Sequence, residues 1–131
     1  CNVTAVGIKI ITTFTQLTGL CLSECSRIND EVIEIIATEC KKLTKLEVTL
    51  CNLTDESMEI IATYCINLNR LDIVACGITL AAVKKWIGVF STLSHCYVGC
   101  DEEDASTMKE IMRLHPNIDF GTNCLKFEQT E

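Results

Sequence analysis

The sequence has little of several residue types. Aromatic residues make up 5% of its 131 positions, proline occurs once, at Pro116, and glycine occurs six times. With 48% apolar residues, this composition excludes a flexible linker or a disordered chain. Basic residues are also few: 11 Lys and Arg face 18 Asp and Glu, and the net charge is −7. That balance disfavours nucleic acid or an anionic membrane as the main partner, because both require clustered basic side chains.

Long apolar runs and catalytic motifs are missing as well. The apolar stretches are short and interrupted by charged residues, so we expect no transmembrane helix. The sequence contains no P-loop, no glycine-rich nucleotide fingerprint and no HExxH motif. A Cys-His hydrolase needs a thiolate beside an oriented base, and the two histidines, His95 and His115, offer little support for one. We therefore expect a binding protein and not an enzyme, with no cofactor and no metal.

Cysteine, in contrast, is abundant, with ten residues. Cys25, Cys51 and Cys76 follow one another at intervals of 26 and 25 residues. Cysteines that recur with a structural period are expected to pack as small buried residues. A secreted disulfide framework and a redox-active or metal-binding cysteine column are the alternatives. We expect packing, and with it a reducing compartment, the cytoplasm or the nucleus.

One pattern of apolar residues recurs along the whole chain. The pattern LxxLxLxxC begins at Leu17, Leu43 and Leu68, and weaker copies begin at Leu93 and Ile118. The steps between these starting positions are 26, 25, 25 and 25 residues. Such regular spacing indicates internal repeats of one structural unit. The first residue falls in the middle of a repeat, so we expect the chain to be a piece of a longer protein.

The remainder of each repeat predicts a helix. Apolar residues lie ten, seven, six and three positions before each starting residue, and these spacings mark one face of an α-helix. On this core face the first repeat places Ile10 and Phe14, and later repeats place Trp86 and His115. Residues 29–31, 54–56 and 101–104 combine a capping residue with acidic residues, which is typical of a helix start.

Each repeat is therefore predicted to be a short strand, a turn and a helix of about three turns. One such unit cannot bury its apolar face alone, so neighbouring units are expected to stack on one another. The strands would pair in parallel, about 4.8 Å apart, and the helices would line the other side. Because helices are wider than strands, the stack should curve with the strands on its concave face.

The best repeat carries a recognisable set of residues. Residues 46–51 spell the strand pattern, Leu53-Thr54-Asp55 forms the turn, and residues 65–68 form the Cys-x-x-Leu that ends the helix. The chain resembles the cysteine-containing class of leucine-rich repeats over about residues 1–120. The resemblance implies an α/β solenoid of about five repeats of 25–26 residues. Residues 121–131 depart from the pattern, and we expect them to form a C-terminal tail or cap.

The resemblance also implies a function. This repeat class is similar to the substrate-recognition repeats of F-box-type subunits of cullin-RING ubiquitin ligases, in which the repeats bind the protein to be ubiquitinated. No segment of the sequence reads as an F-box, so the ligase adaptor could be bound only through regions outside this chain. Related repeat proteins without an F-box also exist. The alternative is therefore a structural scaffold subunit of a cytoskeletal, ciliary or other assembly.

The candidate binding residues follow from the strand pattern. The leucines of LxxLxLxxC point into the core, so the residues between them point outward. Residues at the third and fifth positions should then form columns across neighbouring strands, with Leu50 and Val74 adding apolar contacts. Cross-strand ion pairs that only solvate the sheet are the alternative, although exposed tyrosine favours binding. The expected partner-binding residues are Lys45, Glu47, Arg70, Asp72, His95 and Tyr97.

A zinc site is a further alternative. His95, Cys96 and Cys100, joined by His115 or Cys124, contain a spacing that zinc can use. Cys96 occupies a core position and should point inward, whereas His95 should point outward. One ion is not expected to be bound by side chains on opposite faces of a strand.

Overall fold

The protein is an α/β chain in which helices and strands alternate. The structure, a computed structural model, describes residues 5–121. Its four strands form one parallel sheet in chain order: β1 (Gly19–Cys21), β2 (Lys45–Glu47), β3 (Arg70–Asp72) and β4 (His95–Tyr97). The helices that precede and follow them are α1 (Ala5–Thr12), α2 (Asp30–Glu39), α3 (Asp55–Tyr64), α4 (Leu80–Trp86) and α5 (Ala105–Leu114), and two short 3₁₀ helices are η1 (Ile87–Val89) and η2 (Glu102–Asp104).

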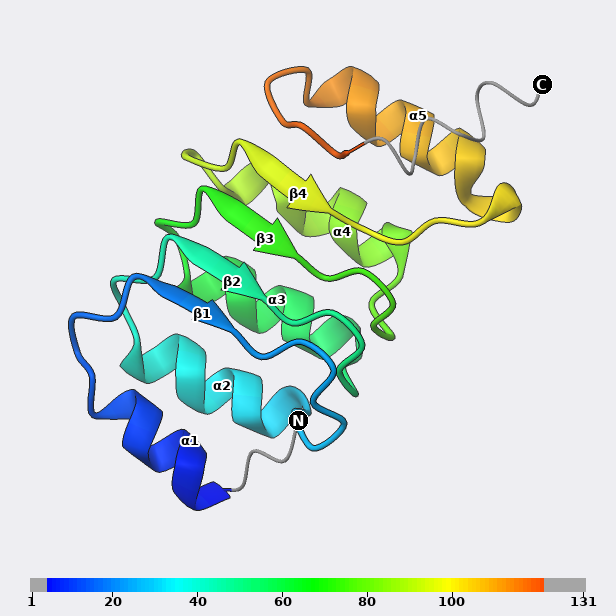
Figure 1. Ribbon diagram of the computed structural model, residues 1–131. Coiled ribbons are helices and arrows are strands. Elements are labelled where there is room, and N and C mark those ends of the chain that lie inside the picture. Colours follow the sequence, from blue (N-terminus) through cyan, green and yellow to red (C-terminus); the bar gives the residue numbers. More distant parts are fainter. Residues whose placement is uncertain (1–4, 122–131) are drawn as a thin grey trace.

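The helices and the strands form two layers. Helices α1 to α4 lie along one face of the sheet, each beside the helix of the next unit, while the other face of the sheet is open (Figure 1). We call this second surface the open sheet face. Helix α5 lies beyond β4, at the end of the row (Figure 1). Within the described part of the chain, no helix has the length and apolar character needed to cross a membrane.

The strand register agrees with the predicted columns. Lys45 lies opposite Gly19 on one side and Arg70 on the other, and Arg70 lies opposite His95. Before each strand, one carbonyl oxygen accepts two hydrogen bonds from the start of the next strand. The Thr18 carbonyl oxygen, for example, accepts them from two successive backbone N–H groups at the start of β2, at 2.7 and 3.1 Å. The register follows from the repeat, because a one-residue slip would turn the buried leucines toward solvent.

The core occupies the space between the two layers. The central strand residues Leu46, Leu71 and Cys96 are fully buried, as the pattern predicts. The helix residues that face the sheet are buried in the middle of the chain, where Ile36 and Ile61 are almost completely inaccessible to solvent. Burial of one such side chain contributes about 1.5–3 kcal/mol. The buried side chains of the strands and of the helices therefore supply the main stabilisation of the sheet.

The core prediction was wrong at the first helix and only partly right further along. Ile10 and Phe14 are 56% and 58% exposed, although the residues at the same positions of the next two repeats, Ile36, Cys40, Ile61 and Cys65, are buried. The reason is positional: α1 is the first described helix and packs against α2 on one side only. Trp86 and His115 are half-buried; Trp86 packs against the edge of the core.

Helix starts are tied to one another between units. Asn29 and Thr54 cap α2 and α3 by accepting hydrogen bonds from backbone N–H groups, as predicted. In addition, the Asp30 carboxylate accepts hydrogen bonds from the Thr54 backbone N–H and hydroxyl, and Asp55 does the same for Thr79. Leu80, 25 residues after Asp55, occupies the equivalent position in α4, so this series of carboxylates stops there.

Two predictions concern the end of the described chain: the helix start at the acidic residues 101–104, and the last repeat, which begins at Ile118. Asp101 accepts a hydrogen bond from the backbone N–H of Asp104, so residues 101–104 do start a helix. Ile118 is half-buried, and its neighbour Asp119 forms a parallel bridge with His95. The degenerate copy thus extends the sheet by one bridge. Of the expected tail or cap, residues 122–131 lie outside the described residues.

Candidate partner-binding face

All six candidate residues lie on three neighbouring strands. Lys45, Arg70 and His95 are the first residues of β2, β3 and β4, and we call them the basic row. Glu47 and Asp72 are the third residues of β2 and β3, and we call them the acidic row. Tyr97 continues the acidic row on β4. Lys45 is exposed and the other five are half-buried, as expected for side chains on a sheet face that none of the described helices covers.

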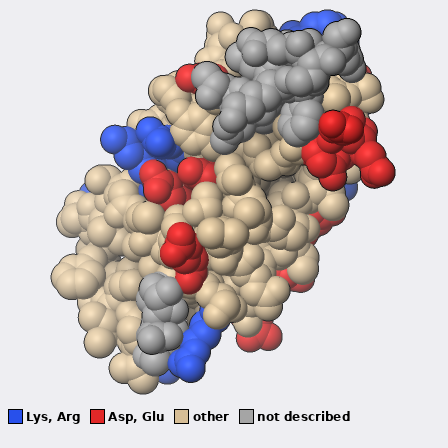
Figure 2. Space-filling model, turned by 45° about the vertical axis from the view of Figure 1, so that its right-hand side comes forward, with Lys and Arg blue, Asp and Glu red and all other residues tan. Residues whose placement is uncertain are grey.

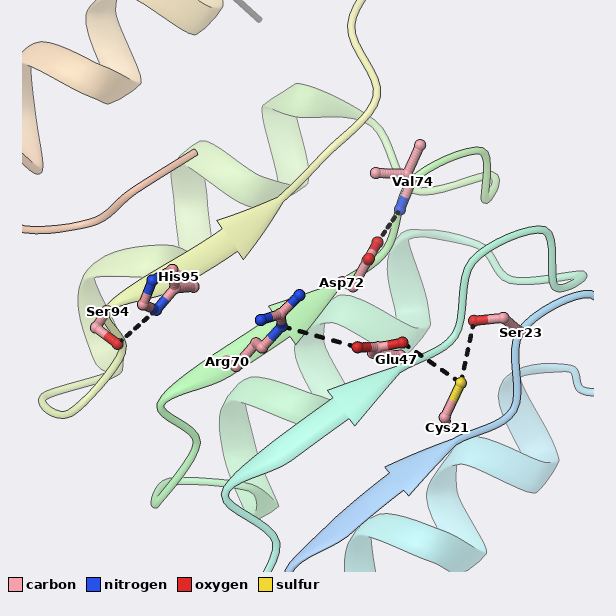
Figure 3. A network of polar contacts seen from close by, with 8 residues as sticks. All are labelled: Cys21, Ser23, Glu47, Arg70, Asp72, Val74, Ser94 and His95. Atoms are coloured by element: carbon pink, nitrogen blue, oxygen red, sulfur yellow. Dashed lines mark hydrogen bonds and ion pairs between the residues drawn. The ribbon is translucent and has the colours of Figure 1, made fainter. Parts of the chain in front are cut away.

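Glu47 is the centre of a small polar network on this face (Figure 3). Its Oε1 lies 3.7 Å from Arg70 Nε, and its Oε2 accepts a hydrogen bond from the Cys21 thiol at 3.4 Å. The two charged side chains are 39% and 36% exposed, so solvent screens the ion pair and its contribution is about 0–1 kcal/mol. Part of the expected cross-strand pairing therefore exists, and the sequence prediction missed the participation of Cys21.

Arg70 also contacts Tyr97, on the neighbouring strand. Its guanidinium carbon lies 5.0 Å from the centroid of the Tyr97 ring, within the range of a cation–π interaction. Its Nε is buried and has no hydrogen-bond partner in the described structure. Glu47 on one side and Tyr97 on the other hold the guanidinium in place, so its outer edge, formed by the two Nη groups, is the part available to a ligand.

Asp72 differs electrostatically from Glu47. Burial raises the pKa of its carboxyl, and the nearby negative charge of Glu47 adds to the increase. The Val74 backbone N–H, which donates a hydrogen bond to Asp72 Oδ1 at 3.3 Å, and the Arg70 guanidinium act in the opposite direction but do not cancel it. The carboxylate of Asp72 is therefore held by its own strand and not by a cross-strand partner.

The backbone of Gly121 lies close to the Tyr97 ring. Gly121 has φ +81°, and a Cβ atom built on it would lie 2.7 Å from the Tyr97 ring. The His95 ring lies 6.3 Å from the Tyr97 ring, centroid to centroid, and His95 Nδ1 lies 2.9 Å from the Ser94 hydroxyl. The close approach of a glycine backbone thus sets the position of this aromatic side chain.

The two apolar residues expected beside the patch occupy turns after the strands. Leu50 is 53% exposed and Val74 is half-buried. Leu50 adopts φ 58°, and Glu24 and Ala75, one repeat away on either side, adopt φ 62° and 58°. This left-handed conformation is unfavourable for residues with a side chain. It recurs because the turn brings the next residue of each repeat, Cys25, Cys51 or Cys76, back toward the core.

The cysteine column is mainly structural. Cys51 and Cys76 donate hydrogen bonds to the Leu22 and Val48 carbonyl oxygens at 3.1 and 2.8 Å, and burial raises the pKa of both thiols. A thiol with a raised pKa is a poor nucleophile and a poor metal ligand at neutral pH. The expectation of simple packing was incomplete for Cys25, which is fully buried and disulfide-bonded.

The proposed zinc ligands are not brought together. Cys96 is fully buried, and His95 is half-buried on the open sheet face. Across residues 5–121 there is no group of three or more His, Cys, Asp or Glu side chains that could hold a metal ion. Cys124, the remaining candidate ligand, lies outside the described residues.

Two concave regions lie away from the open sheet face. A cleft of about 430 Å³ separates the turn after β3 from the turn after β4, and it is lined by Cys76, Leu80, Asp101 and Asp104 among others. A groove of about 450 Å³ between α3 and α4 contains Trp86, whose ring lies 5.1 Å from Lys85 Nζ. In neither place is a buried polar side chain left without a partner within the described structure.

Charges are distributed in small groups over the surface. On the side shown in Figure 2, small groups of acidic and basic side chains are scattered over a mostly uncharged surface, and one basic group touches an acidic group. The basic row is therefore a local feature of a chain whose net charge is −7. A comparison of the sequence with protein-family models finds no match, and a comparison with curated proteins also finds none.

Proposed function

We propose that this chain is a cysteine-containing leucine-rich-repeat solenoid that binds another protein through its open sheet face. One observation carries the proposal: three parallel strands present six polar and aromatic side chains in register, on a surface that no helix of residues 5–121 covers. Arginine and tyrosine are enriched among residues that dominate protein interfaces. Arg70 and Tyr97 are in contact at the centre of this surface.

Binding fits the surface better than catalysis. The six residues lie on strands and not around a deep pocket, and Glu47, Arg70 and Asp72 are engaged with one another or with the backbone. A catalytic site would require a nucleophile beside an oriented base. Cys21, a free cysteine on the neighbouring strand, places its thiol within hydrogen-bond distance of Glu47 and Ser23, which is a structural role.

The repeat class suggests the biological setting. We propose that the chain resembles the substrate-recognition repeats of an F-box-type ubiquitin ligase subunit, with the ligase adaptor bound through regions outside this chain. A reducing compartment, cytoplasm or nucleus, belongs to the same proposal. It is supported by seven free cysteines in the described part of the chain. The disulfide of Cys25 argues against it, so counting the free thiols of protein isolated from cells under alkylating conditions is a direct test.

Affinity capture with a charge-reversed variant tests the function. The wild-type protein and the double variant K45E/R70E would be used to capture proteins from a native lysate, with identification by mass spectrometry. Proteins bound through the open sheet face should be lost from the variant. The matched control is K41E/R113E, which reverses two exposed charges away from the strands. Identical capture by the wild type and K45E/R70E would contradict the proposal.

A second candidate function is a structural subunit of a larger assembly. It is favoured by exposed apolar side chains at the first described helix: Val6 and Ile10 lie about one turn apart on α1, and Phe14 follows the helix end. Stoichiometric, salt-stable co-purification with a cytoskeletal or ciliary assembly would support this candidate. Capture through the strands alone, unaffected by Ile10→Ser, would count against it.

A further inference from the structure

This inference rests on the proposed function and concerns the chemistry of the partner. We propose that the partner presents a pair of carboxylates to Lys45 and to the Nη edge of Arg70. The two side chains lie on neighbouring strands as register partners, at the start of β2 and β3. Within the chain, Glu47 and Asp72 already have hydrogen-bond or ion-pair partners, whereas Lys45 has no ion-pair partner among the described residues.

Both carboxylates of the acidic row already have partners within the chain. Glu47 uses one oxygen for Arg70 and the other for the Cys21 thiol. Asp72 accepts a hydrogen bond from the Val74 backbone N–H and is half-buried (Figure 3). A basic side chain of a partner would have to compete for carboxylates that already have donors. The acidic row is therefore a poor site for a cationic partner.

The basic row has the opposite character. Lys45 is exposed and makes no ion pair with any described residue. Arg70 directs Nε toward Glu47, while 39% of its side chain is exposed and neither Nη group makes a hydrogen bond within the described structure. The two Nη groups of an arginine form a fork that matches both oxygens of a carboxylate. The unsatisfied charge of the patch is thus cationic.

The sheet geometry limits the spacing of the acceptors. Neighbouring parallel strands lie about 4.8 Å apart, so the bases of the two side chains have that separation. Acidic residues at positions i and i+4 of a helix lie about 5–6 Å apart, which fits a helix laid across the strands. Tyr97, which already contacts the Arg70 guanidinium, would border such a helix on β4. A partner helix with two acidic residues on one side is therefore the expected ligand.

The net negative charge of the chain means that the basic row attracts an acidic partner only at short range. The chain carries a net charge of −7, which opposes an acidic partner at long range. Charges separated by more than about 8 Å are largely screened at physiological salt, so the basic row can act only once the partner is close. Binding should then be weak at high salt but should gain little in association rate at low salt.

Nuclear magnetic resonance titration with designed peptides tests the inference. The probe is an alanine-based helical peptide of about 16 residues with glutamates at i and i+4, and the matched peptides carry two glutamines or two lysines there. The isotope-labelled 131-residue chain is titrated at low salt and again at about 0.3 M salt. The expected result is that the Glu peptide shifts the resonances of β2 and β3, including Arg70 Nε–H, and that salt reverses the effect.

Matched variants separate the basic row from other exposed charges. K45Q/R70Q should weaken binding of the Glu peptide at least tenfold, whereas K41Q/R113Q, which removes two exposed charges outside the strands, should leave it unchanged. Both variants keep the buried leucines of the strands, and their spectra show whether they are folded. Equal binding of the Glu and Gln peptides, or stronger binding of the Lys peptide, would overturn the carboxylate inference. Loss of lysate capture in K45E/R70E would still support the binding face, and unchanged capture would overturn the proposed function itself.

Discussion

The carboxylate of Asp30, in the first turn of α2, accepts hydrogen bonds from both the backbone N–H and the hydroxyl of Thr54, which caps α3. The two distances are 3.0 and 2.5 Å. The same carboxylate also accepts a hydrogen bond from Ser57, whose side chain is fully buried. One side chain thus stabilises the start of its own helix and holds the start of the next.

Asp30→Asn is expected to lower the free energy of unfolding by about 1–3 kcal/mol, because the amide keeps only one of the two acceptor oxygens and a donor of the next helix loses its partner. Burial raises the pKa of Asp30, but the hydrogen bonds from Ser57 and Thr54 outweigh it, so the pKa is lowered. The stabilisation is therefore present above the ordinary Asp pKa of about 4 and is lost as pH falls through the lowered value. Urea unfolding of both proteins across this pH range measures it. Glu31→Gln, an exposed neighbour, is the control and should have almost no effect.

Leu46→Ala is expected to cost about 2–5 kcal/mol, since it leaves a cavity in the fully packed centre of β2. Chemical denaturation measures the loss. Ile66→Ala serves as the control because Ile66 is exposed, and it should change stability by less than about 0.5 kcal/mol. A near-neutral result for Leu46 would contradict the register of the strand.

Gly121→Ala is expected to displace the Tyr97 ring and to weaken partner binding. A Cβ at this position would lie 2.7 and 2.9 Å from ring atoms, and φ is +81°, so a side chain is strained there on two counts. Gly88→Ala is the matched control, because the nearest atom to its Cβ would be 3.6 Å away. Ring resonances of Tyr97 report the displacement, and unchanged resonances would show that the ring does not depend on Gly121.

Alkylation of the native protein is expected to modify Cys21 first among the free cysteines that the structure describes. Cys21 is exposed, whereas Cys40 and Cys65 are buried. Burial raises the pKa of the Cys65 thiol to about 12, so the reactive thiolate is almost absent at pH 8. Mass spectrometry after brief treatment with iodoacetamide gives the order of modification. Early modification of Cys65 would mean that the helix layer opens readily.

The repeat period was enough to predict the columns of the open sheet face. A period of 25–26 residues fixes which residues of successive strands are neighbours, and the alternation within a strand fixes which side they face. Lys45 and Arg70 therefore lie where the pattern places them. What the pattern does not contain is the pairing within the columns, since the contact of Glu47 with Arg70 and Cys21 depends on side-chain conformations.

The repeat pattern alone did not predict which helix residues are buried. Ile36 and Ile61 have helices on both sides and are buried, whereas Ile10 has the same place in its repeat and is 56% exposed. Trp86 occupies the same position again but is half-buried and lies at the edge of the core. Periodicity describes one unit, and burial depends on the units beside it.

Leu80 interrupts the series of carboxylates that begins with Asp30 and Asp55, and the cleft between the last two turns opens beside it. Native proteins open in parts, and the parts with fewer ties to their neighbours open at the lowest free energy. We therefore expect helix α5 to form a separate cooperative segment, whose amide hydrogens exchange with solvent through partial opening. The amides of α2 and α3, where Asp30 accepts hydrogen bonds from Thr54 and Ser57, are expected to exchange only when the whole sheet unfolds.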